Sequence, residues 1–147
     1  MKRPGVGLGI IVMNDNKVLL GERKGSHGAG SWSFPGGHIE MFEDLRVCAM
    51  RELEEETGFA EGNVKFIDKY SVATTNDFFP EENKHYITLF MRAKYDKGIP
   101  VVKEKDKCMG WQWFNLDELV NKGYKYRLFT PIKNLIEQGY DPFGGVK

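Results

Sequence analysis

One stretch of the chain, residues 37–59, constrains its fold and chemistry more than any other. It reads GHIEMFEDLRVCAMRELEEETGF. From Glu43 to Thr57 it contains no proline or glycine and is rich in Leu, Met, Ala, Arg and Glu, a composition typical of a helix. Gly58 follows, and glycine is frequent immediately after a helix. The sequence therefore predicts a helix from Glu43 to Thr57 that ends at Gly58.

This helix is predicted to have an apolar side and an acidic side. Its apolar residues recur at spacings of three and four: Leu45, Cys48, Ala49 and Leu53. Glu52, Glu55 and Glu56 stand at i, i+3 and i+4, so their carboxylates project from one side, and Glu54 projects from the opposite side. Like charges at this spacing repel by roughly 0.2–0.5 kcal/mol per pair, and Arg51 alone cannot neutralise three of them. A hard divalent cation can, because Mg²⁺ prefers oxygen ligands.

A glutamate-rich helix face is most often solvated surface, and this alternative applies to any isolated acidic run. The residues before the helix favour a metal site instead. Pro35, Gly36 and Gly37 form a tight loop there. A backbone carbonyl in such a loop can approach a metal because no side chain intervenes.

The stretch resembles the signature of the Nudix hydrolases, G-x5-E-x7-R-E-U-x-E-E-x-G-U, where U is a bulky apolar residue. The match is complete at every specified position: Gly37, Glu43, Arg51, Glu52, Leu53, Glu55, Glu56, Gly58 and Phe59. A chance match at ordinary composition has a probability on the order of 10⁻⁷ per chain. The resemblance implies an enzyme that cleaves a nucleoside diphosphate linked to another group.

The resemblance also implies roles for these residues. The Gly37 carbonyl, Glu52, Glu55 and Glu56 are expected to bind Mg²⁺, with Mn²⁺ able to substitute. Glu43 and Arg51 are expected to bond to one another and to orient the acidic cluster.

Similarity extends along nearly the whole chain. Residues 19–26 (LLGERKGS), 34–38 (FPGGH), 111–114 (WQWF) and 137–143 (EQGYDPF) resemble the small nucleotide-sanitising members of the family, of the thiopurine-nucleotide-hydrolysing type. Phe42 departs from the pattern, since those relatives usually carry glycine beside the first glutamate. We therefore expect the loop before the helix to have an unusual shape.

Three further residues are weaker candidates for the site. Two lie outside residues 37–59, and the third is next to Gly37. Arg23 ends a predicted strand and can contact a phosphate or a base, or be an exposed strand-end charge. His38 follows Gly37 and can meet a phosphate, or be a hydrogen-bonded loop histidine. Glu104 precedes the Trp111 strand and can be an extra metal ligand or base, or a solvated loop residue. Four aromatic residues can stack on a base or belong to the core: Phe78, Phe79, Tyr86 and Trp111.

The remaining chain favours an α/β (α+β) fold. Apolar, β-rich runs predict strands at Val6–Met13, Lys17–Gly21, Val64–Ala73, Tyr86–Ala93 and Trp111–Phe114. Cap and proline signals predict a helix that starts within Asn115–Leu119 and another over Thr130–Gln138. The Nudix fold implied by the resemblance, a mixed β-sheet between helices with the signature as loop–helix–loop, accommodates this order.

The length and charge of the chain limit the number of domains and the classes of partner that we expect. At 147 residues the chain is expected to form a single domain, residues 1–147. Its 21 basic and 21 acidic side chains cancel, so no global field favours nucleic acid or a membrane surface, and no apolar run spans a bilayer. Cys48 and Cys108 are far apart and are interpreted as buried free thiols, so we expect a soluble, cytoplasmic protein. Dimers are common among the relatives, which leaves a homodimer open.

Nucleoside triphosphate hydrolysis to monophosphate and pyrophosphate is the default activity. A modified or oxidised purine deoxynucleotide such as 8-oxo-dGTP leads, because of the whole-chain resemblance. The alternatives are a diphosphohydrolase for a CDP-type, nucleotide-sugar or isoprenyl diphosphate, and a nucleotide-sensing module without turnover. A metal-bound water is expected to attack phosphorus, with Glu55 or Glu52 as the base and Glu104 in reserve. Crowding is expected to raise the pKa of these carboxylates.

Overall fold

The central strand of the sheet is β1 (Gly5–Asn14), in a computed structural model that describes residues 3–25, 27–121 and 126–144. One edge of β1 pairs in parallel with β7 (Lys84–Tyr95), from Gly5 opposite Tyr86 to Met13 opposite Lys94. Its other edge is shared. The start of β1 pairs with β4 (Gly36–His38), and its end pairs with β2 (Lys17–Arg23). Because β2 pairs only with the end of β1, the sheet divides into two wings, one that contains β1, β4 and β7 and one that begins with β2.

The other strands extend the two wings. On one wing, β2 pairs with β3 (Trp32–Ser33) and with β8 (Cys108–Asn115). On the other wing, β5 (Val64–Phe66) and β6 (Ala73–Phe79) both pair with the outer edge of β7. A short 3-10 turn, η1 (Pro80–Glu82), joins β6 to β7. Among the described strands, β1 and β7 form the parallel pair and the other pairs are antiparallel, so the sheet is mixed.

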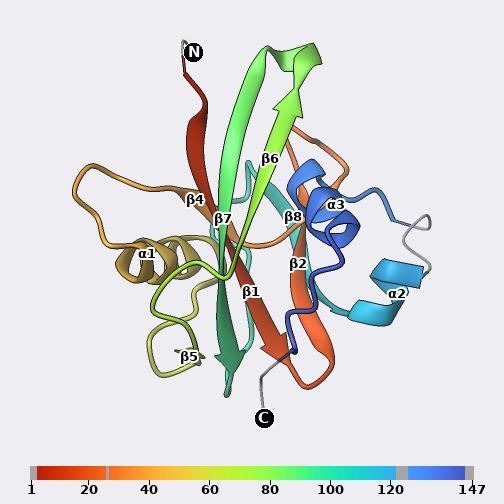
Figure 1. The fold of residues 1–147 in the computed structure, drawn as a ribbon. Helices are drawn as coiled ribbons and strands as arrows, with labels where there is room; N and C mark the ends of the chain where they lie inside the picture. Colours follow the sequence, from red (N-terminus) through yellow and green to blue (C-terminus); the bar gives the residue numbers. More distant parts are fainter. Residues whose placement is uncertain (1–2, 26, 122–125, 145–147) are drawn as a thin grey trace.

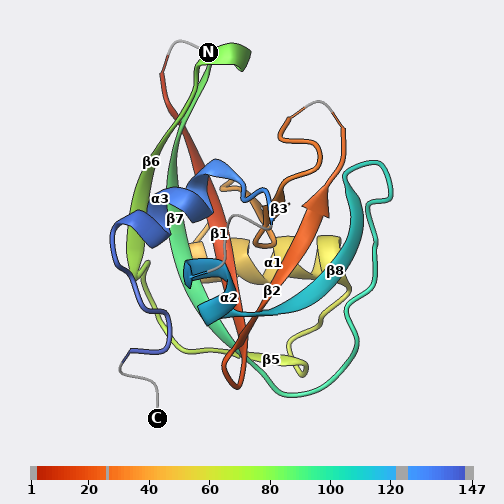
Figure 2. The same cartoon turned by 90° about the vertical axis from the view of Figure 1, so that its right-hand side faces the viewer.

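Helices cover both faces of this sheet (Figure 1, Figure 2). On one face lies α1 (Leu45–Thr57), whose buried residues pack on alternate residues of β1 and β7: Cys48, Ala49 and Leu53 against Leu8, Ile10 and Met91. On the other lie α2 (Leu116–Asn121) and α3 (Thr130–Glu137), which pack on the intervening residues Ile11 and Phe90. Each fully buried side chain of this kind contributes about 1.5–3 kcal/mol. The expected fold, a mixed sheet between helices, is confirmed.

The helix of the signature begins later than predicted. It starts at Leu45 rather than Glu43, because the Asp44 carboxylate accepts a hydrogen bond from the backbone N–H of Arg46 at 3.0 Å and caps the helix. Its end is as predicted, with Gly58 in the left-handed conformation at φ 77°. The predicted helix near Asn115 is also present, and the Asn115 side chain accepts a hydrogen bond from the backbone N–H of Asp117 at 2.9 Å.

The predicted strand Val64–Ala73 is wrong in its extent. β5 ends at Phe66 and β6 begins at Ala73, and residues 68–71 between them leave the edge of β7. The backbone N–H groups of Ile67 and Val72 still donate to β7 carbonyl oxygens. Asp68 in this segment binds the Arg92 guanidinium, with oxygen–nitrogen distances of 2.8 and 2.9 Å. Arg92 also donates to the backbone carbonyls of Pro142 and Gly144, so it connects this segment to residues near the C-terminus. β6 itself was not predicted.

Two further expectations concern the cysteines and membrane spans. Cys48 is buried and Cys108 is partly buried, and both are free thiols. No helix in the described part of the chain is long and apolar enough to cross a membrane. Residues 1–2, 26, 122–125 and 145–147 of the expected single domain lie outside the described residues.

Candidate active site

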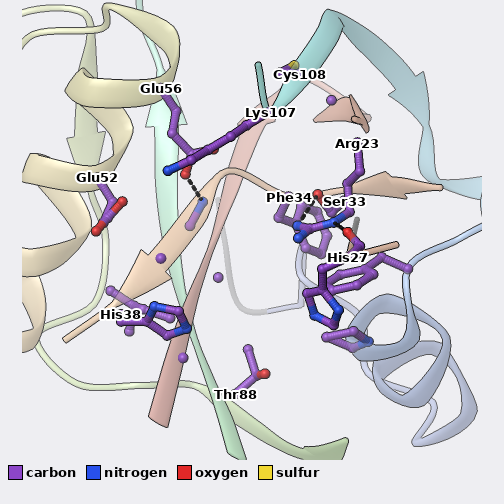
Figure 3. A pocket seen from close by; sticks show the side chains of 18 of the residues that line it. Arg23, His27, Ser33, Phe34, His38, Glu52, Glu56, Thr88, Lys107 and Cys108 are labelled. Atoms are coloured by element: carbon purple, nitrogen blue, oxygen red, sulfur yellow. Dashed lines mark hydrogen bonds between the residues drawn. The ribbon is translucent and has the colours of Figure 1, made fainter. Parts of the chain in front are cut away.

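A cavity of about 750 Å³ opens between the two wings of the sheet. Strands β1, β4 and β7 line one side of it, and β2 and β8 line the other. The C-terminal half of α1 and the loop before β8 reach one end, and the start of α3 lies against the cavity as well. Figure 3 shows Glu52 and Glu56 at one end and Thr88 well away from them.

Three glutamates of α1 line the cavity and their neighbour does not. Glu52, Glu55 and Glu56 are lining residues, whereas Glu54 is exposed and outside the lining. Glu104 joins them from the loop before β8, and its carboxylate lies 3.3 Å from the Lys107 ammonium group. The helical spacing thus places the acidic residues as expected. The fold adds Glu104, which is 48 or more positions further along the chain.

Two glycines let the acidic helix approach β4. A Cβ atom on Gly37 would lie 2.2 Å from the carboxyl carbon of Glu52, and one on Gly36 would lie 2.0 Å from the Leu8 carbonyl oxygen. The backbone N–H of Gly36 donates to Glu56 Oε1 at 2.9 Å. Close packing against backbone therefore requires glycine at position 36, and at position 37 any larger residue would displace the Glu52 carboxyl group. This reason is separate from the expected approach of the Gly37 carbonyl to a metal, which stays a prediction.

Arg51 organises the acidic cluster through several contacts. Its Nε and Nη2 donate to the two Glu43 oxygens at 2.7 and 2.9 Å, a bidentate pair. Its Nη1 donates to Glu52 Oε1 at 2.9 Å, and Glu55 lies further away at 3.4 Å. The Arg51 hydrogen bonds hold the pKa of Glu43 down at about 2. The expected contact between Glu43 and Arg51 is thus present.

Burial raises the pKa of two glutamates in the cavity. The pKa of Glu56 rises to about 8, mainly because the side chain is buried, and the charges of Glu52 and Glu104 add to the rise. Burial also raises the pKa of Glu52, while Arg51 opposes the shift. The expected direction is correct for these two residues. Their main cause is burial rather than crowding, which the sequence alone did not indicate.

The donor set fits a hard divalent cation. Carboxylate oxygens are the ligands that Mg²⁺ prefers, and two of these carboxylates are buried at a cost that a cation would offset. As placed, no three Asp, Glu, His or Cys side chains within residues 3–25, 27–121 and 126–144 converge closely enough to hold one ion. The Glu55 side chain is 52% exposed, so it is the least confined of these glutamates.

Arg23 and His38 both line the cavity, away from each other. The Arg23 guanidinium lies 3.9 Å from the centre of the Phe129 ring and donates to the His27 carbonyl oxygen at 3.0 Å. Burial lowers its pKa, so it is not an exposed strand-end charge. The His38 ring is exposed and stacks on Tyr86 at 5.4 Å between centroids. Their predicted contact with substrate stays a prediction.

Three of the four candidate stacking residues line the cavity. They are Phe79, Tyr86 and Trp111, whereas Phe78 is 62% exposed and lies outside the lining. The Trp111 ring covers Gly21, where a Cβ atom would lie 2.7 Å from it. Phe42, the departure from the family pattern, is fully exposed and adopts a left-handed φ of 61°. The loop therefore keeps the backbone conformation that glycine favours.

Several lining residues carry no signal in the sequence. Phe129 reaches the cavity from the start of α3, and Thr88 reaches it from β7. Strand alternation places Thr88 on the same face as Tyr86 and Phe90, but only the pairing of β7 with β1 shows that this face borders a cavity. His27 also lines the cavity, and its ring contacts the Glu82 carboxylate.

Comparisons with known proteins agree with this geometry. A family model described as NUDIX domain matches residues 3–135. The chain is 32% identical over 116 residues to an oxidized purine nucleoside triphosphate hydrolase of Danio rerio, an alignment covering 75% of this chain and 65% of that protein. It is 25% identical over 148 residues to an RNA pyrophosphohydrolase of Pelagibacter ubique (strain HTCC1062), covering 90% of each. The chain therefore spans slightly less than two thirds of the first of these relatives.

A solved structure shows the same fold. The crystal structure of a MutT NUDIX hydrolase from Burkholderia pseudomallei superimposes with a TM-score of 0.78 and 27% identity. The superposition covers 95% of this chain and 100% of that one.

Proposed function

The chain belongs to the Nudix family of hydrolases, which act on phosphoric anhydrides, and from this premise we propose that it converts a nucleoside triphosphate into monophosphate and pyrophosphate. The proposed substrate is a modified or oxidised purine deoxynucleotide such as 8-oxo-dGTP. The similarity to an oxidized purine nucleoside triphosphate hydrolase supports this choice.

The observation that carries the proposal is the two-ended cavity. One end has four carboxylates suited to a cation that binds phosphates: Glu52, Glu55, Glu56 and Glu104. The rest of the cavity is lined by aromatic rings and by glycines of β1 and β2, and this flat, apolar lining suits a base. The volume of about 750 Å³ lies within the range of small-molecule sites, roughly 300–1,000 Å³. A mononucleotide therefore fits the site in size and in chemistry.

The metal would be held by Glu52, Glu55 and Glu56 with the Gly37 carbonyl, and Glu104 is available as a further ligand. When bound, Mg²⁺ supplies neutralisation of the phosphate charge and a water molecule of lowered pKa. Mg²⁺ is proposed because the family generally uses such a divalent ion, and Mn²⁺ shares the same ligand preference.

Glu55 is the proposed base that accepts the proton of the attacking water, with Glu104 in reserve. The Glu55 side chain is 52% exposed and lies 3.4 Å from Arg51, while Glu52 is held by Arg51 at 2.9 Å. A carboxylate in a close ion pair is a weaker base, because the cation stabilises its charged form. Arg51 and Glu43 keep Glu52 in position, and Arg23 is placed to contact a phosphate or the base.

The proposal is tested by measuring the products formed with Mg²⁺ from a panel of substrates: pyrophosphate from the triphosphates, and phosphomonoesters from ADP-ribose and geranyl diphosphate. The panel contains 8-oxo-dGTP, dGTP, dCTP, ADP-ribose, geranyl diphosphate and an RNA oligonucleotide with a 5′-triphosphate. The expected result is the highest kcat/KM for 8-oxo-dGTP. A higher value for ADP-ribose or geranyl diphosphate would support the diphosphohydrolase alternative. Nucleotide binding without turnover of any compound would support the sensing alternative.

A further inference from the structure

A buried aspartate lies behind the cavity wall, outside the glutamate cluster. Asp77 on β6 is 0% exposed. Among the described residues, no Lys, Arg or His side chain forms an ion pair with it. A carboxylate buried in this way is costly unless neutral donors satisfy its oxygens.

Three neutral donors surround this carboxylate. The Thr88 hydroxyl donates to Asp77 Oδ2 at 2.5 Å, and the Thr75 hydroxyl donates to the same oxygen at 3.1 Å. The Asn134 amide of α3 donates to Oδ1 at 2.8 Å. Asp77 therefore connects β6, β7 and α3, and its carboxylate oxygens accept all three of these hydrogen bonds.

This arrangement limits what Thr88 can offer to the cavity. A threonine hydroxyl has one hydrogen, and here it is directed at Asp77, so only oxygen lone pairs remain for another partner. Thr88 lines the cavity and keeps 8% exposure. It lies opposite Gly7 in the register of β1 and β7, where a Cβ atom would stand 3.8 Å from the Thr88 hydroxyl oxygen. The missing side chain of Gly7 leaves this oxygen uncovered.

Thr88 also lies at the end of the cavity where a base would sit. In Figure 3 it is well separated from Glu56, with His38 and His27 on either side of the space between them. The adjacent carboxylate strengthens the oxygen as an acceptor, because hydrogen bonds in a chain polarise one another. A base that presents an acceptor here could not form a hydrogen bond with Thr88, because both groups would offer lone pairs and neither a hydrogen.

We propose that Thr88 is a specificity-determining residue that accepts a hydrogen bond from an N–H group of the nucleobase, and that Asp77 is a positioning residue that keeps its hydroxyl in the acceptor state. This inference rests on the proposed function in that it takes the ligand to be a nucleotide. Thr88 then favours bases with an exposed amino or ring N–H group over analogues in which that group is absent.

The test is equilibrium binding of nucleoside monophosphates, measured by calorimetry. Two pairs differ by one N–H-bearing group: guanosine against inosine (2-amino) and adenosine against purine riboside (6-amino). A third pair, 8-oxoguanosine against guanosine, adds N7–H together with a C8 carbonyl oxygen. We expect the wild-type chain to prefer the N–H member of at least one pair by roughly tenfold. Thr88→Val should bring that pair within twofold, and Thr88→Ser, which keeps the hydroxyl, should retain the preference.

Asp77→Asn provides a second measurement. Its side-chain amide can donate to Thr88, which frees the hydroxyl hydrogen for the cavity, so the preference should fall while Thr88→Ser retains it. A ratio of two affinities for one variant is insensitive to partial unfolding. The proposal is overturned if the wild type distinguishes no pair, binds none of the monophosphates, or if Thr88→Val discriminates like the wild type.

Failure of the proposed function gives a different result. Selective binding that depends on Thr88, with no triphosphate turnover, would sustain this inference and overturn hydrolysis. Triphosphate turnover without an N–H preference would do the reverse.

Discussion

The glutamate end of the cavity and the Thr88 end are assembled over different distances in the sequence. At the glutamate end, Arg51 bonds to Glu43 eight positions away and to Glu52 beside it. At the Thr88 end, Asp77 bonds to Asn134 across 57 positions. The first end depends mainly on one helix and the loop before it, and the second depends on how two strands and a helix pack. We therefore expect changes at the first end to affect the chemical step and changes at the second to affect binding.

The largest effect is expected at the glutamate end. Glu55→Gln and Glu56→Gln each remove a negative charge from the cavity and one of the proposed metal ligands, and kcat should fall on the order of 10²–10⁴-fold. Glu54→Gln is the matched control, because Glu54 is exposed and outside the cavity, and its kcat should stay within twofold. Steady-state pyrophosphate release measures all three. Near-normal turnover in both Glu55→Gln and Glu56→Gln would refute the metal-site assignment.

A glycine substitution is expected to have the next largest effect. Gly37→Ala places a methyl group 2.2 Å from the Glu52 carboxyl carbon, so Glu52 must move. A displacement of about 1 Å at a catalytic group can cost about 10²-fold in rate, and we expect kcat/KM to fall by a similar factor. Gly62→Ala is the control, since nothing lies within 4 Å of its Cβ position. Equal activity of the two variants would show that this close approach is dispensable.

The Thr88 end should respond in KM. Asn134→Ala removes the donor to Asp77 Oδ1 and leaves a buried acceptor unsatisfied, which costs about 1–3 kcal/mol. We expect KM to rise roughly tenfold, with kcat within twofold, and the melting temperature to fall by several degrees. Gln138→Ala removes an exposed contact between α3 and Thr74 and should change neither parameter appreciably. A loss confined to kcat would contradict the division between the two ends.

The pH dependence of stability tests whether burial raises the pKa of Glu56. The pKa of Glu56 is about 8 in the folded chain, against an ordinary value of 4.5. Between these values the folded chain binds more protons than the unfolded chain, so the free energy of unfolding falls as pH rises from 4.5 to 8. Melting with a chelator present should show a loss of several degrees from pH ~6 to ~8 that Glu56→Gln lacks. The same slope in both proteins would show that Glu56 ionises without a burial penalty.

The smallest effect is expected in the loop before α1. Phe42→Gly relieves a left-handed backbone conformation that costs other residues about 1–2 kcal/mol, partly offset by the entropy of glycine. We expect the melting temperature to rise by about 1–3 °C. Phe42→Ala keeps the backbone cost and removes the same exposed ring. If alanine stabilises the chain as much as glycine does, the ring rather than the backbone is responsible.

Prediction from sequence succeeded where neighbours in the chain are neighbours in space. The end of α1, the shared side of Glu52, Glu55 and Glu56, and the contact between Glu43 and Arg51 all lie within one short segment. It failed where an element depends on a distant partner. The segment between β5 and β6 contacts β7 through the pairing of Asp68 with Arg92, which are 24 positions apart.

The family and the acidic face of α1 can be read from the sequence alone, because the periodicity of a helix relates residues three and four positions apart without reference to the rest of the chain. Tertiary packing, in contrast, removes Glu56 from solvent, brings Glu104 to the same cavity, and places Asp77 against Thr88 at the other end. Burial and strand register arise from segments far apart in the chain. Their physical consequences, a raised pKa and a hydroxyl confined to accepting, appear once those segments pack together.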